Sequence, residues 1–223
     1  MGFDKTLTKE NGEEYLEHVD SVLQRLQPEL SSSLVNGNIC ISGNLICTGD
    51  EGPFDAFEIS AVLPIGFPLA EPYVWETGER IPRTADRHIY PKPGNCCLCV
   101  WEEWLWGKPR AGFKDFLTGP LHSYFVSQSL FELTGKWPFG ERDHDRAGLD
   151  QAIVKMLSDI PNVQVDRALN ILSQPKIKGH ARCPCGSGQR LRNCHYRELE
   201  SAQERLAAVS WKHLRDRRKA YQR

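Results

Sequence analysis

The chain lacks several features that would place it in a broad class of protein at once. Its 223 residues contain no run of eighteen apolar residues, so we expect no transmembrane helix. The 28 Lys and Arg nearly balance the 29 Asp and Glu, which gives a formal net charge of −1. This balance gives no reason to expect nucleic acid or a membrane surface as a partner. Internal repeats are also absent, which argues against solenoid and propeller folds.

The N-terminus and the cysteines indicate a compartment. The first residues, MGFDKTLTKENGEEYL, are polar and acidic, whereas a secretory signal begins with basic residues and continues with an apolar run. The eight cysteines are therefore expected to be reduced thiols in a cytoplasmic protein. The length allows one good domain and a smaller appendage.

The first part of the chain combines one helical pattern with several strand-like patterns. Apolar residues at helical spacing predict an amphipathic helix over residues 10–27. Strand-like runs follow at residues 38–48, 55–63 and 72–76, and we expect the first to bend at Gly43-Asn44. A helix followed by consecutive short strands predicts an α+β fold with an antiparallel meander sheet.

The rest of the chain is mainly helical. After a long irregular stretch at residues 77–93, helical patterns occur at residues 113–134 (broken or kinked near Gly119-Pro120), 149–157, 165–172 and 196–223. We expect a main domain over residues 1–158 and a linker with a short helix over residues 159–181. A small module with a basic helical tail would then occupy residues 182–223.

Four metal-ligand side chains gather near the C-terminus. Cys183 and Cys185 open a stretch of thirteen residues that Cys194 and His195 close, with two glycines between them. Three thiolates and one imidazole can complete a tetrahedral zinc site. The stretch resembles the SEC-C zinc motif, an accessory module at the ends of many bacterial proteins. We therefore expect a structural zinc ion here; the alternative is four free side chains on a surface loop.

A second set of motifs lies in a fixed order upstream. A proline-rich turn with Phe67-Pro68 and Pro72 precedes Arg87-His88-Ile89-Tyr90, then Gly94-Asn-Cys-Cys97-Leu98, then a tryptophan at position 101 or 104. This order resembles the ubiquitin-conjugating enzyme (UBC) family over about residues 10–157, and residues 137–144 resemble its divergent bacterial members. The resemblance implies a UBC-like fold: an N-terminal helix, a meander sheet and C-terminal helices.

The resemblance also implies the roles of the cysteines near position 97. Cys97 matches the residue that forms a thioester, because it stands third after Gly94 and directly before Leu98. Cys96 then takes a position that is usually apolar, and Cys99 one that is often polar. Leu98 is expected to anchor the segment in the core. A cluster of core or metal-bound cysteines at positions 96–99, with His88 as a further ligand, is the alternative interpretation.

His88 departs from the pattern of the family. If Ile89-Tyr90 aligns with the residues after the family's His-Pro-Asn segment, His88 replaces the asparagine that stabilises the oxyanion. An imidazole can donate to an oxyanion as an amide does, so His88 is a candidate catalytic residue. Alignment on the histidine itself makes His88 a structural loop residue instead.

These motifs lead to a functional hypothesis. The resemblance implies a cysteine-dependent transferase that binds the C-terminus of a ubiquitin-like protein or of a cyclic-nucleotide synthase (nucleotidyltransferase) as a thioester on Cys97. It would pass this acyl group to a lysine amine, in bacterial antiphage defence, with a separate activating enzyme if the acyl group does not arrive activated. The alternatives are a non-catalytic module that binds such a C-terminus and a zinc-linked thiol redox protein using Cys96, Cys97 and Cys99, in which Cys96 and Cys99 form the one C-x-x-C pair.

Three further groups of residues are expected to have structural roles. Trp101, Trp104 and Trp106 form a dense aromatic run, and at least two of them are expected to cover the core rather than a partner. His144 with Glu141 and Asp143 is interpreted as a structural turn rather than a metal or acid–base site. The basic tail at residues 215–219 is interpreted as a solvated helix end.

Overall fold

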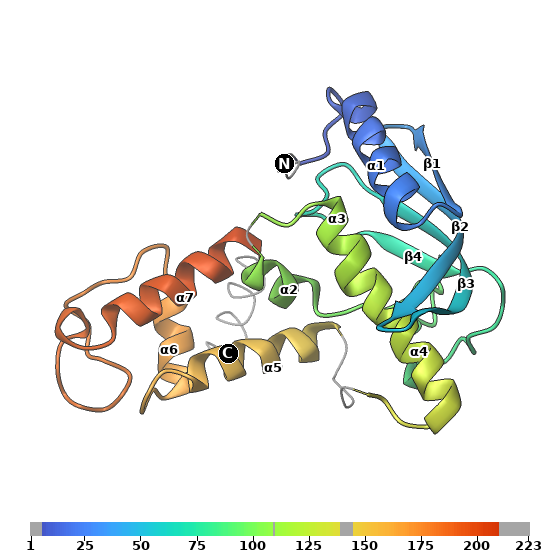
Figure 1. Cartoon of the computed structure of the whole chain (residues 1–223). Helices are drawn as coiled ribbons and strands as arrows, with labels where there is room; N and C mark the ends of the chain where they lie inside the picture. Colours follow the sequence, from blue (N-terminus) through green and yellow to red (C-terminus); the bar gives the residue numbers. More distant parts are fainter. Residues whose placement is uncertain (1–5, 109, 139–144, 210–223) are drawn as a thin grey trace. The chain divides into compact units, whose positions relative to one another are not determined.

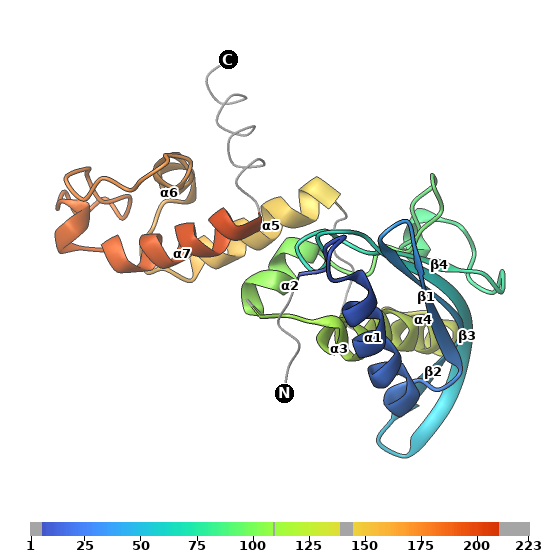
Figure 2. The same ribbon diagram turned by 90° about the horizontal axis from the view of Figure 1, so that it is seen from above.

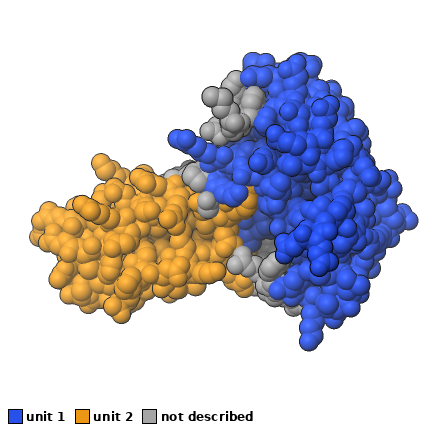
Figure 3. Space-filling model, in the orientation of Figure 1, with its two compact units in different colours: residues 1–101, 108–142 blue, residues 102–107, 143–223 orange. Residues whose placement is uncertain are grey.

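The structure is a computed structural model that describes residues 6–108, 110–138 and 145–209 (Figure 1). The chain divides into two compact units (Figure 3). Unit 1 comprises residues 1–101 and 108–142, and unit 2 comprises residues 102–107 and 143–223. Among the described residues, no helix combines the length and the apolar composition that a membrane span requires.

Unit 1 is built on a four-stranded antiparallel sheet. Its strands follow each other in chain order: β1 (Leu30–Val35), β2 (Asn38–Gly49), β3 (Gly52–Leu63) and β4 (Tyr73–Glu76). Asn36 and Gly37 join β1 to β2, and both have positive φ angles, as a two-residue hairpin turn requires. The predicted α+β class and meander sheet are confirmed.

Helices cover one face of this sheet. α1 (Gly12–Leu26) and α4 (His122–Thr134) lie on the same side of the strands (Figure 2). Alternate residues of β2 and β3 point toward these helices and are buried, among them Ile41, Leu45 and Phe57. The side chains that point away from the helices are partly or fully exposed. The core of unit 1 therefore lies between the sheet and the helices.

Two irregular places are predicted in unit 1, one in a strand and one in a helix. β2 is one continuous strand, as predicted; Gly43, where a bend is expected, has a φ angle of +130°, and the register shift against β3 lies between Cys47 and Thr48. A break or kink is expected at Gly119-Pro120, and there the structure has a π-helical segment, η2 (Leu117–Leu121), between α3 (Phe113–Phe116) and α4. A wider helical turn keeps the chain helical around Pro120, which has no backbone N–H to donate.

Unit 2 is helical around the metal motif. It contains α5 (Asp145–Ser158), α6 (Val165–Leu172), η3 (Leu191–Asn193), α7 (Tyr196–Val209) and residues 102–107 of α2 (Trp101–Gly107). α6 packs against both α5 and α7. α5, placed in the main domain by its position in the sequence, therefore groups with the C-terminal helices. The basic tail at residues 215–219 lies outside the described residues.

Candidate metal centre and thiol site

A short ribbon brings the four predicted metal ligands together in unit 2. The N–H of Cys183 donates to the carbonyl of Gln189 (2.9 Å), and the N–H of Leu191 donates to that of Ala181 (2.8 Å). Between these strands the chain reverses through Gly186 and Gly188, whose φ angles are +78° and +76°. Glycine adopts such angles without steric cost. The reversal therefore returns the end of the motif to its beginning.

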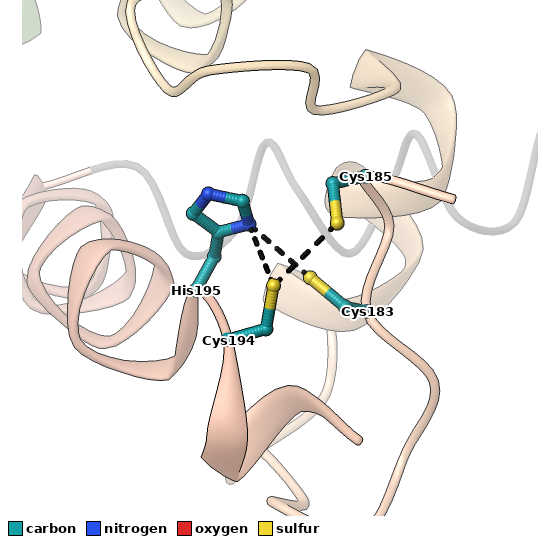
Figure 4. A group of neighbouring side chains, drawn as sticks. All are labelled: Cys183, Cys185, Cys194 and His195. Atoms are coloured by element: carbon teal, nitrogen blue, oxygen red, sulfur yellow. Dashed lines mark hydrogen bonds between the residues drawn. The ribbon is translucent and has the colours of Figure 1, made fainter. Parts of the chain in front are cut away.

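The ligand atoms converge on a common point (Figure 4). His195 Nδ1 lies 3.3 Å from Cys183 Sγ and 3.4 Å from Cys194 Sγ, and the sulfur atoms of Cys185 and Cys194 are 3.6 Å apart. All four ligand atoms lie within 4.8 Å of one another. A tetrahedral zinc ion places its sulfur and nitrogen ligands roughly 3.5–3.8 Å apart. The cluster is compatible with a metal site.

The surroundings of the thiols act in opposite directions. Burial raises the pKa of Cys183 to about 11. The Ser187 hydroxyl, 3.2 Å from the sulfur of Cys185, lowers the pKa of Cys185 to about 6. Metals bind cysteine as the thiolate, and several thiolates this close together repel each other. A divalent cation would relieve that repulsion and stabilise the buried Cys183 as a thiolate.

No other cluster of this kind occurs in the described part of the chain. The alternative metal site, with His88 and the three cysteines at positions 96–99, is not among the groups whose ligand atoms come together. The acidic and histidine residues at positions 141, 143 and 144 lie outside the described residues.

The second candidate site surrounds Cys97 in unit 1. Residues 88–90 and 95–97 run antiparallel, with a bridge between Ile89 and Cys96. The N–H of Cys97 donates to the carbonyl of His88 (2.8 Å), and the N–H of Cys96 donates to that of Val74 in β4 (2.7 Å). Cys96 is buried and Cys97 is half-buried. The cysteine segment (residues 95–97) is thus hydrogen-bonded both to β4 and to residues 87–90, which we call the histidine loop.

Tyr90 contributes a side chain that the sequence did not single out. Its hydroxyl donates a hydrogen bond to the sulfur of Cys97 over 3.3 Å. The two residues meet because Tyr90 pairs with the same short segment: its N–H donates to the carbonyl of Asn95 (2.9 Å). A hydroxyl donor at this distance favours the thiolate, which is the nucleophilic form of cysteine.

The backbone of His88 is hydrogen-bonded to that of Cys97. It adopts a left-handed conformation with φ 53° and ψ 44°, and its carbonyl accepts the N–H of Cys97. Its ring packs edge-on against Trp137, with the ring centres 4.6 Å apart. The structure therefore brings His88 to the cysteine segment and holds its ring against an aromatic residue.

Helix α4 holds the histidine loop at a third point. Arg87 is buried, and its Nε donates to Oε1 of Gln128 (2.9 Å), while Nε2 of Gln128 donates back to the carbonyl of Arg87 (2.8 Å). One turn earlier, the Tyr124 hydroxyl donates to the same carbonyl (3.1 Å). We call Arg87, Tyr124 and Gln128 the loop clamp. It fixes the position of the residue that precedes His88.

The buried thiols of unit 1 are not candidates for the nucleophile. Burial raises the pKa of Cys96 to about 11 and that of Cys47 to about 12, so both are protonated at neutral pH. Leu98, expected to anchor the loop in the core, is partly exposed instead.

Trp101 is buried and donates to the carbonyl of Pro68 (2.9 Å), in agreement with a covering role. The side chains of Trp104 and Trp106 are partly exposed.

Comparison with known proteins gives one local match. The SEC-C motif model matches residues 181–197, which include all four clustered ligands. The predicted motif is confirmed over this segment. No curated protein matches the chain.

Proposed function

We propose that the SEC-C motif holds one zinc ion with a structural role. The three thiols and the imidazole supply the donor set that zinc prefers, and their spacing suits a tetrahedral centre. Four protein ligands leave no open position for water or substrate, so bound zinc contributes stability rather than catalysis. Cys183, Cys185, Cys194 and His195 are the proposed ligands.

We propose further that unit 1 is a ubiquitin-conjugating-like transferase with Cys97 as its nucleophile. One observation carries this proposal: Cys97 is partly exposed, and its sulfur accepts a hydrogen bond from Tyr90, whereas its neighbour Cys96 is buried. The order of elements supports it, since a helix and a four-stranded meander precede the cysteine segment, as the resemblance implies.

The proposed chemistry is a sequence of two acyl transfers. The Cys97 thiolate attacks the carbonyl carbon of a thioester at the C-terminus of the partner protein, and the donor's thiolate leaves. A neutral lysine amine then attacks the new thioester, the Cys97 thiolate leaves, and the amine nitrogen loses a proton to solvent. One C–S bond is exchanged for another in the first step, and an amide forms in the second. Neither step needs an oxidant or a metal.

Two side chains are proposed to assist these steps. The Tyr90 hydroxyl stabilises the Cys97 thiolate both before attack and as a leaving group. His88 is the proposed donor to the oxyanion of the tetrahedral intermediate, in place of the family's asparagine. Its packing against Trp137 would hold the imidazole in one orientation during the reaction.

The resemblance to divergent bacterial members supports a ubiquitin-like protein or a nucleotidyltransferase as the conjugated protein, in antiphage defence in the cytoplasm. A separate activating enzyme would supply the thioester.

The proposal is tested by incubation with candidate partners and their activating enzyme, followed by non-reducing gels and mass spectrometry. A reductant-sensitive adduct should form on the native protein, vanish in Cys97→Ala and persist in Cys96→Ala and Cys99→Ala. In His88→Ala, transfer to lysine should slow by roughly tenfold to a thousandfold, the usual effect of losing one oxyanion donor. An adduct that persists in Cys97→Ala and disappears in Cys99→Ala would show that Cys99, and not Cys97, is the nucleophile.

The second candidate is a non-catalytic module that binds the same kind of C-terminus. The observation that favours it is the histidine at the position proposed for the family's asparagine, with its ring packed against Trp137. Such a module would bind its partner equally well in Cys97→Ala and would form no adduct in either protein.

A further inference from the structure

Unit 2 has a local charge imbalance that the balance of the whole chain hides. Residues 167–197 contain seven of the chain's 28 Lys and Arg and none of its 29 Asp and Glu. All seven side chains are exposed, and none forms an ion pair with another described residue. We call them the cationic surface: Arg167, Lys176, Lys178, Arg182, Arg190, Arg192 and Arg197.

Two of these arginines lie directly opposite each other. Arg182 and Arg190 form an antiparallel bridge on the ribbon that carries the metal ligands. Directly opposite residues in an antiparallel pair project from the same face, with their Cβ atoms about 4.5–5.5 Å apart. Like charges in this arrangement destabilise the pair. An anion bound between the two guanidinium groups would remove that repulsion.

Neighbouring contacts extend the arginine pair. The N–H of Arg192 donates to the carbonyl of Gly179 (2.9 Å), and a Cβ added at Gly179 would lie 3.2 Å from the Cβ of Arg192. Lys178 directly precedes this glycine in the chain. The backbone therefore gathers at least four cations on one short stretch beside the metal ligands.

The composition of the surface indicates the class of partner. Among the described residues, the large apolar side chains that are exposed all lie outside residues 167–197. Protein–protein interfaces use apolar and aromatic anchors at their centres, and membrane-surface helices need an apolar face. Protein–nucleic acid interfaces are more polar and much more positively charged. Five of the seven cations are arginines, whose planar group binds phosphate with two parallel hydrogen bonds.

We propose that the cationic surface binds the phosphodiester backbone of a nucleic acid without reading its base sequence. Phosphate contacts of this kind position a protein and supply affinity that depends steeply on salt. The proposal does not depend on the chemistry of Cys97. It assigns to the C-terminal unit a ligand that the net charge of the whole chain gave no reason to expect.

The test is fluorescence anisotropy with the zinc-loaded full chain and labelled 20-nucleotide probes: single-stranded DNA, the same sequence as RNA, and duplex DNA. We expect binding that weakens sharply between 50 and 200 mM salt. The triple variant R182Q/R190Q/R192Q should bind at least tenfold more weakly at 100 mM salt. The magnitude of its negative slope of log K against log salt should decrease by about 2–3, because each lost phosphate contact reduces that magnitude by about 0.7–0.9.

Matched variants make the result specific. The control R25Q/R83Q/R110Q removes three exposed arginines from unit 1 and should bind like the native protein. If the triple variant loses its zinc, K176Q/K178Q/R197Q, which leaves the ribbon intact, should still lower affinity and slope. Three results would overturn the proposal: no binding of any probe at 50 mM salt, equal weakening in the control, or polyglutamate or anionic vesicles bound as tightly as the probes.

Discussion

The hydrogen bond from Tyr90 to Cys97 gives one hydroxyl group an influence on the reactivity of the thiol. A donor that faces sulfur stabilises the negative charge of the thiolate, so its removal should make Cys97 less nucleophilic. Tyr90→Phe keeps the ring and removes only this donor. The residue thus offers a test of the site that needs no partner protein.

In Tyr90→Phe we expect iodoacetamide to alkylate Cys97 several-fold more slowly at pH 7, on the order of tenfold if the hydrogen bond is to a full thiolate. The measurement is peptide mass spectrometry over a time course, with Cys99 in the same molecule as the reference. Equal slowing at both cysteines would point to a change in loop exposure instead, and unchanged alkylation of Cys97 would contradict the role.

The stability of unit 1 is expected to depend on pH through His122. Its Nε2 accepts the N–H of Thr48 (3.1 Å), and burial lowers the pKa of His122. A depressed pKa means that the unfolded chain takes up the proton more readily. The stabilising contribution of neutral His122 is therefore complete above the unfolded pKa of about 6.5 and is lost as the pH falls below it.

We expect the urea midpoint of unit 1 to fall between pH 7.5 and pH 5.5. The fall should be smaller in His122→Gln, which can still accept the Thr48 N–H but does not titrate. His18, whose pKa is also lowered by burial, remains in both proteins and contributes in the same direction. If both proteins lose the same stability over this range, His122 does not provide the pH dependence.

At the residue scale, proximity in sequence decided what could be predicted. The four metal ligands lie within thirteen positions, so their types and spacing alone indicated the cluster. Tyr90 reaches Cys97 only because residues 88–90 pair with residues 95–97, and that pairing leaves no mark in composition or period. Tyr124 and Gln128 meet Arg87 across some forty residues, which a single sequence does not indicate.

At the scale of elements, helix α4 both covers the sheet and holds the loop beside the candidate nucleophile. The loop clamp joins Arg87 to two residues one helical turn apart. The Nε of Arg87 donates to Gln128, and its carbonyl accepts from Gln128 and Tyr124. A buried guanidinium that loses a partner keeps its desolvation cost. The clamp should therefore be sensitive to a change that hardly alters volume.

Gln128→Leu should lower the free energy of unfolding of unit 1 by about 1–3 kcal/mol, because Nε and the carbonyl of Arg87 each lose a buried partner. Leu133→Gln on the same helix is the control; Leu133 is 79% exposed, and its change should stay within about 0.5 kcal/mol. The measurement is urea unfolding followed by tryptophan fluorescence. Equal effects in the two variants would show that the clamp does not stabilise the loop.

Elements with a clear period were predictable, and those fixed by neighbours were not. α1 and α6 lie where apolar spacing placed them. β1 has three consecutive serines, Ser31 to Ser33, and forms because β2 offers it an edge to pair with. α2 contains three tryptophans, which have only a moderate helix propensity and conceal the helix in the sequence.

At the scale of the whole molecule, the two units are expected to respond differently to loss of metal. Unit 2 gathers its motif around four ligands, whereas unit 1 has its own sheet and core. The sequence placed residues 149–157 with unit 1 by continuity; the structure groups α5 with unit 2 because α5 packs on α6. A sequence period shows that a helix has an apolar face, but not which neighbour covers it.

Chelation of zinc should increase hydrogen exchange at residues 165–209 and leave the strands of unit 1 protected. Cys183→Ser/Cys194→Ser should show the same pattern without chelator and should bind less than one equivalent of zinc by elemental analysis. The readout is hydrogen–deuterium exchange with mass spectrometry. Unchanged exchange in unit 2, or equal loss of protection in both units, would contradict a local structural role of the metal.

The central proposal, that Cys97 carries an acyl group, is tested most directly by the intact mass of Cys97→Ser after incubation with the partner protein and its activating enzyme. A serine ester is more stable than a thioester, since an alkoxide is a poorer leaving group than a thiolate. We predict a one-to-one adduct that survives reductant and maps to the peptide containing position 97. A reductant-sensitive adduct that persists in this variant and maps to Cys96 or Cys99 would contradict the assignment.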